Sequence, residues 1–97
     1  MEKKNVIVLG IKSELKKIRE NPQRFISEKE AIITYCKDIG SFNTLVKEIN
    51  PSAVYYTGKI RQYTEPYGWA MTANDSERIG EYIKSKGIEK IVKLKIN

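Results

Sequence analysis

The sequence feature that most constrains the fold is a short, continuous apolar run at residues 5–11, NVIVLGI. The run is of strand length, is rich in β-branched side chains, and is flanked by lysines. Such a run is typical of a strand that is buried on both faces, as the strands of parallel sheets are. Because parallel strands are joined by crossover connections that usually contain a helix, we expect helices to alternate with strands along the chain.

Helical spacing and terminating residues predict three helices. The first is capped by Ser13 and ends at the Asn–Pro pair at residues 21–22, because the residue before a proline avoids the α region. The second is capped by Ser41 and ends at another Asn–Pro pair, at residues 50–51. The third begins at Asn74, which has Glu77 three residues later, and ends at Gly87, where a left-handed C-cap is favoured.

Residues 31–36, AIITYC, allow two interpretations. Their β-branched and aromatic composition predicts a second buried strand. Residues 27–30 also spell a helix-capping box, and apolar residues at helical spacing follow it, so a single helix over residues 28–49 is the alternative. Gly40 and Ser41 would lie inside that long helix and disfavour it. We therefore prefer the strand.

The remaining strands predict the fold class. Residues 53–58 and 88–96 have strand composition, the former could continue to residue 63, and residues 69–73 could return antiparallel to it. The prediction is a single α/β domain over residues 1–97, with a four-stranded, largely parallel sheet, helices packed on it and an extra antiparallel hairpin strand. The long-helix alternative would give an α+β, ferredoxin-like βαββαβ sandwich.

Composition excludes several classes of function. With one Cys and no His, the chain cannot form the usual zinc sites or use histidine as a general base. It contains no recognisable catalytic motif, so we expect a binding protein without a cofactor rather than an enzyme. No apolar run approaches the ~20 residues that cross a bilayer, and the start of the chain lacks a signal-peptide core. We expect a cytoplasmic protein with no membrane partner, in which Cys36 is a buried structural residue.

The charge of the chain points to anionic partners. The net charge is +6, from 18 Lys and Arg against 12 Asp and Glu. The positive surplus lies in residues 1–25 and 84–97, whereas the middle of the chain is slightly acidic. A basic surface favours nucleic acid or a phosphorylated small molecule as partner. A solvated, Lys-rich exterior with no specific partner is the alternative.

Small, hydroxyl-bearing and cationic residues follow three of the predicted strands. Ligands of open parallel sheets bind beyond the carboxyl ends of the strands, where loops lead into helices. Glycines, hydroxyls and cations at such ends suit a phosphate group, although αβ loops carry the same residue types for capping and turning. The predicted site for a nucleotide or another phosphorylated ligand contains Gly10, Lys12, Ser13, Lys37, Gly40, Ser41, Thr57 and Gly58.

A second set of residues predicts a nucleic-acid interface, which is the function that we rank first from the sequence. If the strand from residue 53 to residue 63 is continuous, aromatic and cationic side chains alternate along one of its faces, and the last strand could add two lysines. Aromatic rings stack on bases while cations track phosphates. The predicted interface contains Tyr55, Lys59, Arg61, Tyr63, Lys93 and Lys95.

A third function class is a small adaptor or inhibitor that acts by protein–protein contact. A domain of this size could dock on another protein through its sheet edge, or form a homodimer that buries such an edge. The size of the chain fits this class as well as the two others.

Overall fold

The computed structural model of the chain describes residues 3–57 and 76–96. Four parallel strands form one sheet in the order β2-β1-β3-β4. The strands are β1 (Lys4–Leu9), β2 (Ala31–Cys36), β3 (Ala53–Thr57) and β4 (Lys90–Leu94). The helices are α1 (Lys12–Glu20), the short α2 (Pro22–Phe25), α3 (Ile39–Ile49) and α4 (Ser76–Lys84). The predicted α/β class with a four-stranded sheet is confirmed.

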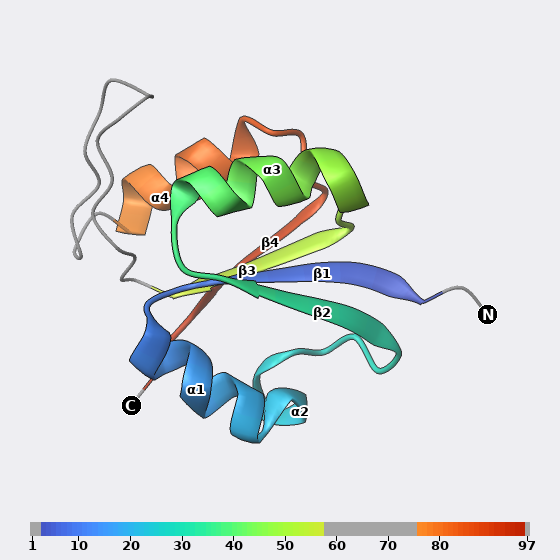
Figure 1. The fold of residues 1–97 in the computed structure, drawn as a ribbon, viewed down its shortest axis with the longest axis vertical. Helices are drawn as coiled ribbons and strands as arrows, with labels where there is room; N and C mark the ends of the chain where they lie inside the picture. The colour runs from blue at the N-terminus through green and yellow to red at the C-terminus, as the bar shows by residue number, and fades with distance from the viewer. Residues whose placement is uncertain (1–2, 58–75, 97) are drawn as a thin grey trace.

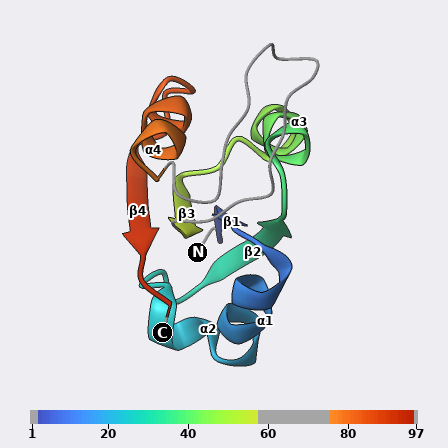
Figure 2. The same ribbon diagram turned by 90° about the vertical axis from the view of Figure 1, so that its left-hand side faces the viewer.

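The helices cover both faces of the sheet. Helices α1 and α2 lie on one face, and α3 and α4 lie on the other (Figure 1). Figure 2 shows the same layers from the side, with β2 and β4 at opposite edges. The chain crosses from one face to the other between α2 and α3, so β1 and β3, which stand side by side, are followed by helices on opposite faces.

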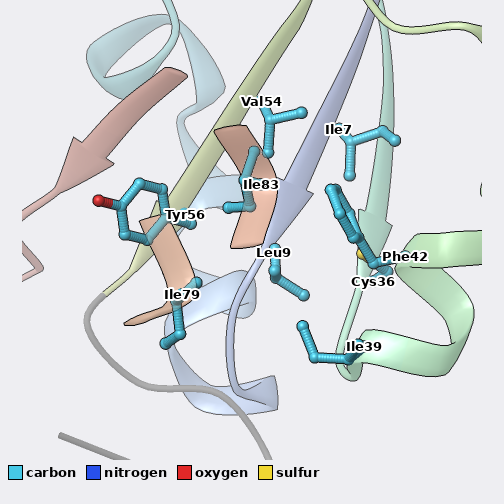
Figure 3. Close-up of a cluster of buried hydrophobic side chains, with 9 residues drawn as sticks. All are labelled: Ile7, Leu9, Cys36, Ile39, Phe42, Val54, Tyr56, Ile79 and Ile83. Atoms are coloured by element: carbon cyan, nitrogen blue, oxygen red, sulfur yellow. The ribbon is translucent and has the colours of Figure 1, made fainter. Parts of the chain in front are cut away.

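Each face has its own apolar core, since side chains alternate along a strand. Ile7 and Leu9 of β1 pack with Phe42 of α3 and with Ile79 and Ile83 of α4, as Figure 3 shows. On the other face, the intervening residues of β1 pack against α1 and against the loop after α2. Strand β1 is therefore buried on both faces, as its continuous apolar run predicts.

Residues 31–36 form a strand, so the long helix over residues 28–49 and the ferredoxin-like alternative are wrong. The helix begins instead at Ile39, where the Asp38 side chain accepts a hydrogen bond from the Ser41 amide at 2.7 Å. Ser41 was expected to be the cap and is in fact the capped residue. The expected Ser13 cap is also wrong, because α1 begins at Lys12 after Ile11 and no side chain caps its start.

Strand β2 lies at the edge of the sheet, which the sequence did not reveal. Its residues are mostly half-buried, and Ile32 is 52 % exposed, whereas the prediction was a strand buried on both faces. The carbonyls of Glu30 and Cys36 accept hydrogen bonds from the two ends of β1. By alternation, the backbone N–H and C=O groups of Ile33 and Tyr35 point away from β1, towards the open edge.

Several predictions fall on residues 58–75, which lie outside the described part of the chain: the continuation of β3 to residue 63, the antiparallel return at residues 69–73 and the first residues of the third predicted helix. The end of that helix is described, and Gly87 has the expected positive φ of 75°. None of the helices in residues 3–57 and 76–96 is long and apolar enough to cross a membrane.

Candidate functional site

A groove opens where β1 and β2 end and α1 and α3 begin. It has a volume of about 1260 Å³ and is lined by residues between 11 and 19, between 34 and 37, and between 40 and 45. Thr34 and Tyr35 both line it, although they point to opposite faces of β2. The groove therefore wraps around the open edge of β2, and the two helices form its walls. Figure 1 shows both helices starting at this same end of the sheet.

The lining is strongly cationic. Lys12, Lys16 and Arg19 stand four and three residues apart on α1 and all line the groove, and Lys37 joins them from the end of β2. Residues at this spacing share one face of a helix. Among the described lining residues there is no Asp or Glu. Glu14 lies in the first turn of α1 but does not line the groove, so the groove carries a local surplus of positive charge.

Arg19 and Tyr35 form a cation–π pair in the groove. The Cζ atom of Arg19 lies 4.5 Å from the centroid of the Tyr35 ring, within the range of a cation–π interaction. The half-buried ring packs against the apolar core on the α1 face. Burial raises the pKa of the Tyr35 hydroxyl, and the nearby Arg19 charge partly opposes that shift. Tyr35 is therefore neutral at physiological pH, and Arg19 supplies the charge.

The opposite wall of the groove is small and polar. Gly40, Ser41 and Thr44 of α3 line it, and the Thr44 hydroxyl donates to the Gly40 carbonyl at 3.2 Å. The starts of α1 and α3 both border the groove, and the N-terminal end of a helix carries a partial positive charge. The positive ends of the two helix dipoles thus add to the positive charge of the four cationic side chains.

Five of the eight residues that were predicted to bind a phosphorylated ligand meet in this groove: Lys12, Ser13, Lys37, Gly40 and Ser41. Gly10 and Thr57 do not line it. They are in contact with each other between β1 and β3, where a Cβ on Gly10 would stand only 2.8 Å from Thr57 Oγ1. Gly58 lies outside the described residues. The groove thus brings together predicted residues that follow two of the strands, β1 and β2.

Sequence reasoning missed the apolar lining residues and, among the cationic and hydroxyl-bearing ones, Lys16, Arg19, Thr34, Tyr35 and Thr44. The spacing of Lys12, Lys16 and Arg19 could have shown the cationic face of α1. Helical spacing alone identifies that face only as the polar side of an amphipathic helix, because it does not show where the edge of the sheet lies.

Among the described residues of the predicted nucleic-acid interface, Tyr55 and Lys93 do not share one face of the sheet. Tyr55 is 2 % exposed and packs in the core on the α1 face. Lys93 pairs in register with Tyr56, and Tyr55 pairs with Val92. The expected common face for Tyr55 and Lys93 is therefore wrong, because paired residues of parallel strands point to the same side. Lys95 follows the end of β4 and is exposed, and Lys59, Arg61 and Tyr63 lie outside the described residues.

The Tyr55 hydroxyl belongs to a polar cluster at the other end of the α1 face. It donates to Glu28 Oε1 at 2.5 Å and accepts from the Ser27 amide at 3.1 Å. Lys90 Nζ donates to Glu28 Oε2 at 2.9 Å and to Ser27 Oγ at 2.7 Å. These hydrogen bonds connect the loop after α2 with β3 and β4.

Ser27 and Lys90 do not form a nucleophile–base pair. The hydrogen bond to Glu28 and the neighbouring Tyr55 hydroxyl raise the pKa of the Lys90 ammonium group, so Lys90 stays protonated and does not accept the Ser27 proton. Burial alone would raise the pKa of Glu28, and the hydrogen bonds from Tyr55 and Lys90 outweigh burial and hold it below its ordinary value. The cluster is a structural ion pair with hydrogen bonds.

Cys36 is buried at the end of β2, beside Phe42 and Ile39 (Figure 3). Burial, together with the nearby Asp38 carboxylate, raises the pKa of its thiol to about 12. The thiolate, which is the reactive form, is therefore scarce at neutral pH. This confirms the prediction that Cys36 is a buried residue.

Metal-ligating side chains do not gather in the described residues, where no group of three or more His, Cys, Asp or Glu residues could hold a metal ion. Comparisons of the chain with models of protein families, with curated proteins and with solved structures found no significant match in any of the three.

Proposed function

We propose that this chain binds a phosphorylated small ligand in the groove between α1 and α3. The observation that carries the proposal is the charge of the lining, which has four cations and, among its described residues, no carboxylate. Placing like charges along one groove is unfavourable unless solvent or an anion compensates them. A phosphate group supplies that compensation, because it carries negative charge and several strong acceptor oxygens.

The position of the groove supports the proposal. It lies beyond the carboxyl ends of β1 and β2, where parallel sheets commonly bind ligands. No side chain caps the start of α1, so the first backbone N–H groups, at Lys12 and Ser13, are suited to donate to an anion. Ser13 and Ser41 add hydroxyl donors on the two walls.

Binding of nucleic acid through β3 and β4 has less support. A base cannot stack on Tyr55 while its ring stays buried, and helices cover both faces of the sheet. The nucleic-acid contacts predicted for Lys59, Arg61 and Tyr63 stay a prediction. Docking on a protein through a sheet edge also stays a prediction.

The test measures binding of inorganic tripolyphosphate by calorimetry and by the rise in melting temperature. A ligand that binds only the folded state stabilises it by mass action. We expect Lys16→Gln to weaken binding about tenfold, since a charge-assisted hydrogen bond contributes roughly 1.5 kcal/mol.

The matched control is Lys47→Gln. Lys47 is an exposed lysine in the last turn of α3 and does not line the groove, so this change removes the same charge elsewhere. If wild type binds no phosphate compound at low salt, or if the two variants bind equally well, the proposed function is wrong.

A further inference from the structure

We infer that the ligand of the groove is a nucleotide, whose base stacks on Arg19 and whose phosphates lie towards Lys12 at the start of α1. This inference rests on the proposed function and specifies the class of ligand. Three observations carry it: the apolar part of the groove, the Arg19–Tyr35 pair, and the order of the cations along α1.

The groove has an apolar part that a phosphate group alone would not contact. Ile11 and Leu15 line it on the α1 side, and Leu45 lines it on the α3 side. Its volume of about 1260 Å³ is also larger than the ~300–1,000 Å³ of typical small-molecule sites, and a bare phosphate would fill little of it. Apolar side chains contribute to binding only by contact with an uncharged part of the ligand. The ligand should therefore join an anion to an uncharged group.

The Arg19–Tyr35 pair provides a place for a flat ring. The Tyr35 ring packs on the core with Arg19 4.5 Å above its centroid, and Arg19 is exposed. Because Arg19 is exposed and lines the groove, its guanidinium can contact the Tyr35 ring and a ligand in the groove at the same time. Guanidinium planes stack on aromatic rings and on nucleobases. A lysine in the same place would keep the charge but could not stack in this way.

The cations on α1 are ordered along the length of a nucleotide. Arg19 and Lys12 are seven residues apart, which is about 10 Å along a helix, and Lys16 stands between them. A base at Arg19 places the sugar between Arg19 and Lys16, and the phosphates along Lys16, Lys12 and Ser13. Ser41 and Thr44 line the groove on the α3 side, and their hydroxyl oxygens can accept hydrogen bonds from the sugar.

The test compares ATP, tripolyphosphate and adenosine on wild type and on two variants, by calorimetry at fixed salt. We expect wild type to bind ATP about tenfold or more tightly than tripolyphosphate, because stacking adds to the phosphate contacts. Arg19→Lys keeps the charge and removes the flat guanidinium, so it should weaken ATP binding about tenfold and change tripolyphosphate binding less than twofold. Lys16→Gln should weaken the binding of both compounds alike.

The outcomes separate this inference from the proposed function. If ATP and tripolyphosphate bind equally well, or if Arg19→Lys weakens both to the same extent, Arg19 acts only as a charge and the nucleotide inference is overturned while the groove remains an anion site. If adenosine binds as tightly as ATP, the phosphate part of both proposals is wrong. If no compound binds, both proposals fail.

Discussion

The Tyr55 hydroxyl donates a hydrogen bond to the Glu28 carboxylate, with 2.5 Å between Tyr55 Oη and Glu28 Oε1. Tyr55 belongs to the buried strand β3, and Glu28 belongs to the loop between α2 and β2. The second oxygen of Glu28 accepts from Lys90 at 2.9 Å, so one carboxylate connects the loop with two strands. The Tyr55 ring lies in the core on the α1 face, and this contact satisfies its hydroxyl there.

Tyr55→Phe should lower the free energy of unfolding by about 1.5–3 kcal/mol, the range for hydrogen bonds to charged groups. The ring stays in the core, and the Glu28 carboxylate loses a donor. The control is Tyr56→Phe on the same strand, because the Tyr56 hydroxyl has no hydrogen bond to another described residue. Urea unfolding measures both, and equal losses for the two variants would contradict the role of the Tyr55 hydroxyl.

The Glu28 carboxylate should also make stability depend on pH. Its folded-state pKa lies below the ordinary value of 4.5. A group with a lowered pKa stabilises the folded state above its unfolded pKa, and this stabilisation is lost as pH falls through the folded pKa. We therefore expect the free energy of unfolding to fall below pH 4.5 in wild type and to fall less steeply in Glu28→Gln. Parallel curves for the two proteins from pH 6 to pH 3 would show that Glu28 does not contribute.

Gly10→Ala should destabilise the protein by roughly 1–3 kcal/mol, as overpacking in a core does. The added Cβ would stand 2.8 Å from Thr57 Oγ1 and 3.0 Å from Thr57 Cγ2. Thr57→Ala removes both atoms, so the double variant should lose less stability than the sum of the two single changes. A double-mutant cycle measures the difference, and strict additivity would show that the two residues do not press on each other.

Substitutions of two neighbouring isoleucines test the position of β2 at the edge of the sheet. Ile33 packs against the core on the α1 face, whereas Ile32 is 52 % exposed. Ile33→Asp should lower the free energy of unfolding by about 2 kcal/mol or more, because it places a charge in an apolar cluster. Ile32→Asp should cost less than about 1 kcal/mol.

Hydrogen exchange provides an independent check of the same strand. The Ile32 amide points towards β1 and the Ile33 amide points to the open edge, so the Ile33 amide should exchange faster. The reverse order of exchange rates, or equal losses of stability in the two Asp variants, would contradict the edge position of β2.

The sequence by itself determined the elements and the class of fold. The local signals are the apolar run in β1, the strand composition of residues 31–36 and the Asn–Pro pairs after α1 and α3. Each of them depends only on backbone conformation or side-chain alternation over a few neighbouring residues. The same local information placed Lys12, Ser13, Lys37, Gly40 and Ser41 at strand ends, and all five line the groove.

Only the tertiary structure decided which of these elements are neighbours. The order β2-β1-β3-β4 places β2 at an edge, buries Tyr55, and turns the cationic face of α1 towards the groove that contains Arg19 and Tyr35. Alternation along a strand is the same in a central strand and in an edge strand, so it shows which residues share a face but not what covers that face. Strand pairing depends on the burial of apolar surface over the whole chain. The strand order that results from it creates the groove at the edge of β2.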